Sequence, residues 1–344
     1  MGIFRFDNIH GNFQGGSVCL YPLMLSTLFD GWLTARAFAS AQRRGIAPVT
    51  FQKVLTPLGR LRVTDTAGPG PVVVFVPDGP NVVEHYQVLI LRLSSSCRVV
   101  CFDMPGFGFS LPAASYTHSL DQGAQTVLDV LNYLNVPRAT LAFSCANGFY
   151  ALRAARLAPD RIAGLVLSQT PSLKAMHAWT MNVVPAPLKI PVLGQLVGWL
   201  MRKRAAASWY RLALPRGTDT SEFQDIALNA LRCGACFSLA GVVQGLLREP
   251  HTALDVVDTP CTVIWGVKDR SHRATDPRSV LEIVPHAEVV EFDDCGHFPD
   301  LENSARYAEI LQERISRHAA TLSMVMLRDK KLENPWRKNG NIPL

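Results

Sequence analysis

Residues 139–157 read ATLAFSCANGFYALRAARL and join a short apolar strand to a helix through the tight segment 144–146. Residues 139–143 are apolar enough to be buried on both faces, and residues 145–157 are expected to form the helix. A hydroxyl or thiol at such a turn stands at a helix N-terminus, where the helix dipole favours negative charge. The segment therefore predicts a strand followed by a helix, with a hydroxyl and a thiol at their junction.

The alternation of short strands and longer helices extends to both sides of this turn. Helices are expected after residue 81, at 119–134 and at 304–318, and a Pro-Gly turn at 56–59 fits a hairpin. This pattern is typical of an α/β fold with a mostly parallel sheet flanked by helices. The other expected strands are 50–55, 60–65, 72–76, 98–102, 162–168, 261–265 and 289–292.

The strand pattern stops between residues 171 and 250, where stretches rich in Leu, Trp and Met predict an inserted helical cap or lid. Nine Lys and Arg against four Asp and Glu in residues 174–250 give this piece +5 of the total charge of +6. A chain of 344 residues suits one large α/β domain or two small ones. We expect a helical extension at 1–45, the core at 46–170 and 251–320, the cap at 171–250, and a loosely ordered tail at 321–344.

An apolar helix is expected near the N-terminus. The apolar run from residue 18 to 29 is interrupted by Pro22 and is too short to span a bilayer, and we do not expect a signal peptide. The helix is expected to pack on the main domain, or to make a homodimer or membrane-surface contact. Eight scattered cysteines favour a reducing, cytoplasmic compartment. The apolar residues at helical spacing are Leu25, Leu28, Phe29, Trp32 and Leu33.

The turn after the strand at 139–143 leaves two candidate nucleophiles. Ser144 has an alanine two positions to either side, and such small neighbours favour it on local sterics, whereas Cys145 has Phe143 and Asn147 there. A thiol at a helix N-terminus and near a histidine has its thiolate favoured, and it needs less activation than a hydroxyl. The residues of the turn alone leave both positions open.

Three further segments carry distinctive residues after expected strands: DMPGFGFS at 103–110, WGVKD at 265–269 and DDCGHFP at 293–299. Together with the strand-turn-helix segment, they resemble the α/β-hydrolase superfamily over about residues 49–318. The flanking sequence matches the family spacing without gaps only when Cys145 is the nucleophile. The resemblance therefore favours Cys145 over Ser144.

The resemblance implies a capped hydrolase whose triad is Cys145, Asp269 and His297, similar to the Cys-Asp-His triad of dienelactone hydrolase. Asp269 would accept the Nδ1 proton of His297 and hold the imidazole in the correct tautomer. The motifs occur in the chain order nucleophile, acid, histidine that the superfamily uses. The alternative interpretation is a buried strand-end cysteine on an inactive hydrolase scaffold.

The resemblance also implies an oxyanion hole built from two backbone N–H groups. Ala146 would supply one of them, and Gly79 the other, in the segment VPDGPN at 76–81 where the family's usual histidine is replaced. No metal, nucleotide cofactor or nucleic-acid partner is expected. The side chains expected to contact substrate are Asp78, Ser144, Trp179 and Phe298.

The expected activity is hydrolysis of an ester, thioester or lactone with a hydrophobic acyl group, through an acyl-cysteine intermediate. The basic excess of the cap suggests an acyl group carried on an acyl carrier protein or coenzyme A. An acyltransferase or cyclising thioesterase could use the same acyl-cysteine, and a non-catalytic hydrolase-like binding protein is a further alternative.

Overall fold

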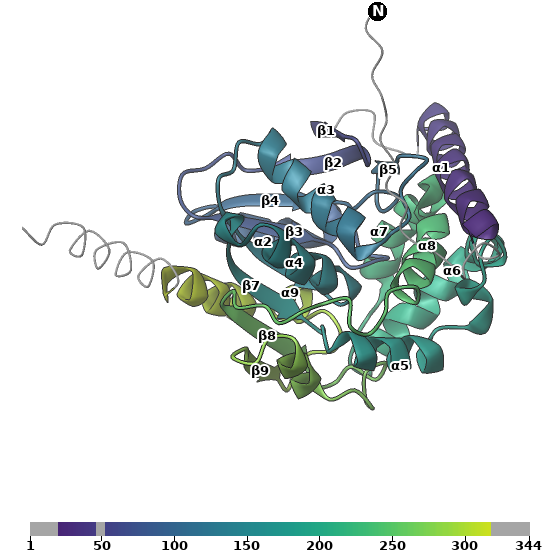
Figure 1. Cartoon of the computed structure of the whole chain (residues 1–344). Helices are drawn as coiled ribbons and strands as arrows, with labels where there is room; N and C mark the ends of the chain where they lie inside the picture. Colours follow the sequence, from purple (N-terminus) through teal and green to yellow (C-terminus); the bar gives the residue numbers. More distant parts are fainter. Residues whose placement is uncertain (1–19, 46–51, 318–344) are drawn as a thin grey trace, which may run out of the picture.

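The computed structural model describes residues 20–45 and 52–317, and within them a nine-stranded sheet forms the centre of the molecule (Figure 1). The strand order is β1-β2-β4-β3-β6-β7-β8-β9, with β5 paired to β2. Pairing is parallel from β4 to β9, and antiparallel where β2 meets β1, β4 and β5. The expected mostly parallel sheet flanked by helices is therefore confirmed.

The strand bounds are close to those expected from the apolar runs. Residues 50 and 51 of the first expected strand, the first nineteen residues of the expected extension and the expected tail at 321–344 lie outside the described residues. The strands are β1 Gln52–Thr56, β2 Gly59–Asp65, β3 Val72–Val76, β4 Arg98–Phe102, β5 Leu111–Pro112, β6 Ala139–Ser144, β7 Ile162–Ser168, β8 Cys261–Gly266 and β9 Glu288–Phe292.

Two apolar cores lie on opposite faces of the sheet. Val74 and Val76 of β3 belong to the core covered by α3 (Leu120–Tyr133) and α4 (Ala146–Leu157). The alternate residues Val73 and Phe75 belong to the other core, which α2 (Gln87–Leu93) and the helix at 304–317 cover. Because both faces of these strands are buried, the strands are continuous apolar runs in the sequence. The short helices of the core are η1 Val83–Tyr86, η2 Pro159–Arg161, η5 Pro277–Glu282 and α9 Pro299–Glu302.

The helices inserted between β7 and β8 lie at one end of the molecule (Figure 1). One stretch of them, Ser221–Leu246, is long and apolar enough to cross a membrane by length and composition, but 61% of its 18-residue apolar window is buried inside the protein. It is therefore part of the packed interior of the insertion. The inserted helices are α5 Leu173–Val183, η3 Ala186–Lys189, α6 Leu193–Ala213, α7 Ser221–Ala230, η4 Leu231–Ala235 and α8 Cys236–Leu246.

The N-terminal helix α1 (Leu20–Arg43) packs on the inserted helices, but only Leu33 of the described apolar residues that its spacing marked lies against their core. Leu28, Phe29 and Trp32 of the same set are exposed. The contact with η4 is close at Gly234, where an added Cβ would lie 2.8 Å from the Cα of Thr34. Such a close approach favours small side chains on α1, which explains the difference. The buried side chains of α1 include Thr27, Asp30, Thr34, Phe38 and Ala41.

Replacing Asp30 by Asn is expected to stabilise the protein above neutral pH and not at pH 4.5. Burial raises the pKa of Asp30 to about 7, although the hydrogen bond that Gln195 donates to it acts to lower the pKa. Because the folded state then binds more protons than the unfolded chain, stability falls as pH rises from about 4 to about 7. The gain at pH 8 should reach at most about 4 kcal/mol, measured by urea unfolding at both pH values. An equal effect at pH 4.5 and pH 8 would contradict this assignment.

Candidate active site

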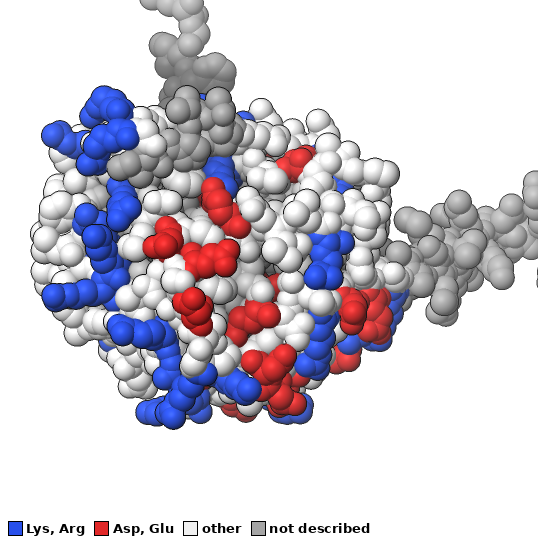
Figure 2. Space-filling model, turned by 180° about the vertical axis from the view of Figure 1, so that it is seen from behind, with Lys and Arg blue, Asp and Glu red and all other residues white. Residues whose placement is uncertain are grey.

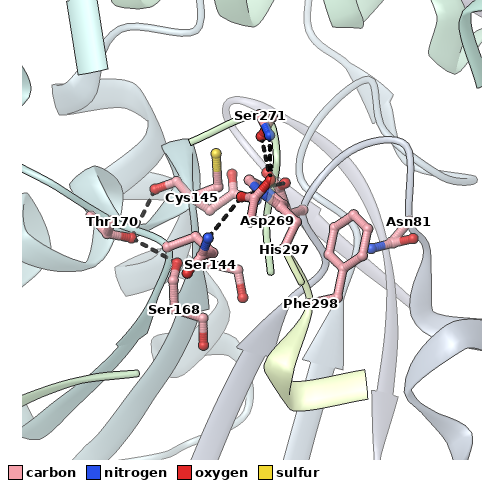
Figure 3. A network of polar contacts seen from close by, with 12 residues as sticks. Asn81, Ser144, Cys145, Ser168, Thr170, Asp269, Ser271, His297 and Phe298 are labelled. Atoms are coloured by element: carbon pink, nitrogen blue, oxygen red, sulfur yellow. Dashed lines mark hydrogen bonds and ion pairs between the residues drawn. The ribbon is translucent and has the colours of Figure 1, made fainter. Parts of the chain in front are cut away.

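Cys145 occupies the turn between β6 and α4 in a conformation that few non-glycine residues adopt, with φ 51° and ψ −124°. Its N–H donates to the carbonyl of Ser168 at 2.7 Å, and its own carbonyl accepts from Thr170 Oγ1 at 3.0 Å (Figure 3). These two contacts with the end of β7 and the segment that follows hold the strained turn. The thiol therefore stands at the N-terminus of α4, beyond the carboxyl end of the sheet.

Ser144 is the last residue of β6 and has a different environment. Its hydroxyl is buried and donates to Asp300 Oδ2 at 3.1 Å. The prediction that Ser144 contacts substrate is therefore not supported by its position, because its side chain is engaged below the turn. The close approach of α4 to the neighbouring loop falls at Gly148, where a Cβ would lie 2.2 Å from Thr170 Oγ1. The elbow thus tolerates Asn147, whose amide donates to the Pro77 carbonyl.

Asp269 and His297 form a direct hydrogen-bonded pair, although they lie on the loops after β8 and β9 respectively. His297 Nδ1 donates to Asp269 Oδ2 at 2.6 Å (Figure 3). Gln169 Nε2 donates to the same oxygen at 2.7 Å, and the N–H and hydroxyl of Ser271 both donate to Asp269 Oδ1. Burial by itself would raise the pKa of Asp269, but His297 and these donors hold it well below its usual range. Asp269 is therefore an ionised, fully oriented acceptor.

The imidazole of His297 is fully buried among aromatic rings. Trp209 meets it edge to face at 5.0 Å between centroids, and His272 stacks on it at 5.3 Å. Burial opposes its positive charge, but the carboxylate of Asp269, together with Cys145 and Asp78, raises the pKa of His297 well above its ordinary value. His297 is consequently a strong base when neutral, with Nε2 as the nitrogen that Asp269 leaves available.

Asp78 brings a second carboxyl group to the same histidine. Its Oδ2 lies 3.3 Å from His297 Nε2, and its side chain lines the same cavity as Cys145. Burial raises the pKa of Asp78, although His297 opposes the shift. Burial and the Asp78 charge together raise the pKa of Cys145 to about 11, although His297 acts to lower it. Burial and Asp78 thus oppose ionisation of the thiol, whereas His297 favours it.

Replacing Asp78 by Asn is expected to make Cys145 form its thiolate at lower pH. The Asp78 carboxylate is ionised in the pH range where the thiol titrates. Its removal therefore eliminates a like-charge repulsion of about 1.4 kcal/mol or more, which lowers the pKa of Cys145 by roughly one unit. The rate of alkylation by iodoacetamide, followed against pH, measures the shift. Asp121→Asn, which removes an exposed carboxylate from α3, serves as the control. An unshifted profile would show that Asp78 does not act on the thiol.

His272 is a residue of this site that the sequence reasoning missed. It lies three positions after Asp269, stacks on Trp179 with the rings 2° from parallel, and has a buried Nε2 without a hydrogen-bond partner among the described residues. Within the described part of the chain, Cys145, His272 and His297 are a group that could hold a metal ion, because their ligand atoms lie within 4.8 Å of one another. The signal in the sequence that could have indicated His272 was its position on the same loop as Asp269.

A cavity of about 320 Å³ opens beside Cys145 and runs under the inserted helices. Asp78 and Trp179, two of the predicted substrate contacts, line it, and so do Gly79 and Ala146, the predicted oxyanion-hole residues. A larger residue in place of Gly79 would displace the Phe107 ring, because a Cβ would lie 2.6 Å from it. Most of the remaining lining is apolar, and it includes Met176, Val183, Leu188, Trp209, Leu212, Leu239, Val243 and Leu246.

Phe298 does not lie in the wall of this cavity, contrary to the prediction that it contacts substrate. Its ring is fully buried and packs against His297, Tyr210 and Phe223. The position next to His297 in the sequence suggested a substrate contact, but the chain turns there so that only the histidine faces the thiol. Phe298 thus contacts the ring of His297 from the side of the core.

Comparison with known proteins gives the following similarities. A family model described as "Alpha/beta hydrolase family" matches residues 73–310, well over half of the chain. A 2-hydroxymuconate semialdehyde hydrolase of Pseudomonas sp. (strain CF600) is 24% identical over 73% of this chain and 89% of its own length. The dihydrolipoyllysine-residue acetyltransferase component of the acetoin cleaving system of Pseudomonas putida is 27% identical over 66% of this chain, a match that spans 58% of that protein.

Solved structures share the fold. A thermophilic esterase from Thermogutta terrifontis superimposes with a TM-score of 0.63 at 20% identity, covering 78% of this chain and 99% of that one. At this identity the likeness concerns the fold alone.

Proposed function

The chain belongs to the alpha/beta hydrolase family, and from this premise we propose that it cleaves an ester, thioester or lactone with a large apolar acyl group through an acyl-cysteine on Cys145. The observation that supports this most is the position of the thiol. It stands on the strained turn at the N-terminus of α4, within 4.8 Å of a ring nitrogen of the His297 that Asp269 orients. A nucleophile, a base and an orienting acid are what acyl transfer requires.

The first half of the reaction forms the acyl-enzyme. Cys145 Sγ attacks the acyl carbonyl while its proton passes to His297 Nε2, and Asp269 stabilises the imidazolium that results. The carbonyl oxygen becomes negatively charged, and the backbone N–H groups of Ala146 and Gly79 would donate to it. The bond to the leaving alcohol or thiol then breaks, and the leaving group takes the proton from His297 Nε2.

The second half releases the acyl group. His297, now neutral again, removes a proton from water as the water oxygen attacks the acyl-cysteine carbonyl. The carbon–sulfur bond breaks, the free acid leaves, and Cys145 regains the proton from His297. Each catalytic cycle therefore consumes one water molecule and releases one free acid and one alcohol or thiol.

The cavity supports a substrate whose acyl group is apolar and carries no distal charge. Apart from Asp78 and Cys145 beside the reacting atoms, the described residues that line it include no titratable side chain. A carboxylate at the far end of the substrate would therefore lose its hydration without a cationic partner, which is costly in such an environment. An acyl chain gains about 0.8 kcal/mol for each methylene that enters.

Lengthening the acyl chain of a p-nitrophenyl ester is expected to raise kcat/KM about fourfold per methylene until the cavity is filled. A matched ester of the same length with a terminal carboxylate should react at least about 100-fold more slowly, because its charge would be buried without a partner. Initial rates across the two series measure both effects. Equal rates for short, long and charged substrates would reject the proposed specificity.

Acyl transfer is the second candidate, and the apolar lining around Cys145 favours it because such a surface retains little water. An alcohol or amine would then replace water in the second half of the reaction. Product analysis in the presence of a medium-chain alcohol distinguishes the two activities. New ester with little free acid supports transfer, whereas free acid in proportion to substrate consumed supports hydrolysis.

A further inference from the structure

One side of the molecule is strongly basic. From residue 171 to 218 the sequence contains seven Lys and Arg and no Asp or Glu. These residues include α5, η3 and α6, which lie together with α1 at the right of Figure 1. In the view from behind, Lys and Arg gather along the left edge of the molecule, while Asp and Glu lie mainly over its middle and right (Figure 2). The positive charge is therefore concentrated on the side of α1 and α6.

The same side exposes large apolar residues at an unusual density. Trp32 of α1 is 56% exposed and Trp199 of α6 is 46% exposed. The guanidinium of Arg36 lies over the Trp32 ring at 5.3 Å, and that of Arg202 over the Trp199 ring at 5.7 Å. Each helix thus presents an indole paired with an arginine. The other exposed apolar side chains here are Leu28, Phe29, Met181, Ile190, Leu193, Leu196, Leu200 and Met201.

The two helices are joined directly. Gln195 of α6 donates to Asp30 of α1 at 3.2 Å, and both side chains are buried. α1 also packs on η4 and α8 of the insertion. The exposed residues of α1 and of α6 therefore belong to two helices that are held together. We call this surface the basic-apolar face. It consists of the exposed apolar residues named above together with Arg36, Arg202, Lys203 and Arg204.

This face adjoins the opening of the cavity. Ala205 and Ser208 of α6 line the cavity and are themselves exposed. Met201 lies one helical turn before Ala205 and is also exposed. An apolar molecule could thus pass from the basic-apolar face into the cavity beside Cys145 over apolar surface.

We propose that the basic-apolar face binds the surface of an anionic membrane, with the cavity opening turned towards the lipid. Tryptophan and aliphatic side chains enter the boundary between headgroups and acyl chains, and arginine and lysine contact the negatively charged headgroups. The long stems of the basic side chains allow their charges to reach the headgroups while the indoles insert. Delivery of an apolar substrate from the membrane to Cys145 is a consequence that rests on the proposed function.

A second copy of this chain fits the basic-apolar face less well than an anionic membrane does. A two-fold symmetric dimer places the same patch of each subunit against the other. Arg36, Arg202, Lys203 and Arg204 of one subunit would then face a patch of the same positive charge on the other, and like charges in contact disfavour association. An anionic lipid surface offers the complementary charge and an apolar layer together.

The test is flotation of the full chain with vesicles. Vesicles of phosphatidylcholine and phosphatidylglycerol at 7:3 are expected to carry at least ten times more protein than pure phosphatidylcholine vesicles, and high salt should reduce this binding. The double variants Trp32→Ser/Trp199→Ser and Arg36→Glu/Arg202→Glu should each lose at least tenfold of it. Leu91→Ser/Arg92→Glu on α2 is the matched control, since Leu91 is 73% exposed and Arg92 is exposed beside it.

Several outcomes would overturn the proposal. Equal binding to both kinds of vesicle, or equal loss in the α2 control, would show that the face has no special affinity for anionic lipid. A concentration-dependent dimer in light scattering that the tryptophan variants abolish would assign the face to self-association. Binding of an acyl carrier protein that the arginine variants abolish, with no binding to vesicles, would assign it to a protein carrier.

The membrane proposal and the proposed chemistry are tested separately. Cys145→Ala should float with anionic vesicles as wild type does, because the thiol lies outside the basic-apolar face. The tryptophan variants should hydrolyse a short soluble ester at the wild-type rate but an ester dissolved in vesicles at least tenfold more slowly. Loss of vesicle binding in Cys145→Ala would contradict the docking orientation, whatever the activity of the protein.

Discussion

Cys145→Ala is expected to remove all activity above background and all covalent acylation by an activated thioester. The reason is that Cys145 supplies the nucleophile, and no other described thiol or hydroxyl shares its position on the turn beside His297. With the nucleophile absent, the reaction loses its covalent route, and the fall in kcat/KM should be at least about 10⁴-fold. Intact-protein mass spectrometry after brief exposure to the thioester measures the adduct, and product release measures the rate.

Ser144→Ala is the matched control, because it removes the neighbouring reactive group of the same turn. The Ser144 hydroxyl donates to Asp300, so its loss should cost about 1 kcal/mol of stability and leave the acyl adduct in place. An adduct that persists in Cys145→Ala and disappears in Ser144→Ala would reverse the assignment. Absence of an adduct and of turnover in wild type, across several acyl classes, would favour the non-catalytic binding protein.

Asp269→Asn is expected to reduce kcat/KM by about 10³- to 10⁴-fold with little change in fold. An amide in this position presents a donor to His297 Nδ1 and so favours the tautomer whose proton is on the wrong nitrogen. The variant also removes the carboxylate that, against burial, does most to raise the pKa of His297. The acidic limb of the residual pH–rate profile should therefore move to lower pH, because the histidine becomes neutral at lower pH.

Three measurements separate this catalytic effect from simple damage. Circular dichroism and urea unfolding should show a folded protein, and Cys145 should still react with iodoacetamide at high pH. Asp78 is the other carboxyl group within reach of His297, at 3.3 Å from Nε2. A loss of less than about tenfold, with the acidic limb unmoved, would mean that Asp269 does not orient the histidine during the reaction and would direct attention to Asp78.

The architecture was predictable because it depends on patterns that are local in the sequence. Apolar runs bounded by turns indicated the buried strands, and the helical segments lay close to their observed bounds. The motifs around 265–269 and 293–299 indicated Asp269 and His297 through their resemblance to the α/β-hydrolase superfamily, which places its acid and its histidine after two late strands. The pairing of Asp269 with His297 was therefore expected.

Other features of the site depend on contacts that no local pattern records. Small neighbours favoured Ser144 on local sterics, yet the turn falls at Cys145, and Ser144 instead meets Asp300, 156 positions away in the chain. His272 was missed because a single histidine in a loop carries no periodic signal. Phe298 was expected to contact substrate, but it packs in the core.

The N-terminal helix shows the same division. Its apolar spacing predicted a buried face that includes Leu28 and Trp32, whereas the tertiary structure buries Asp30 and Thr34 and leaves the tryptophan exposed. Sequence periodicity reports which side chains share a face of a helix, and it therefore determined the elements, their order and the motifs at the strand ends. Which face is covered depends on the shape and polarity of a distant surface, here Gln195 and Gly234, and only the tertiary structure places that surface against the helix.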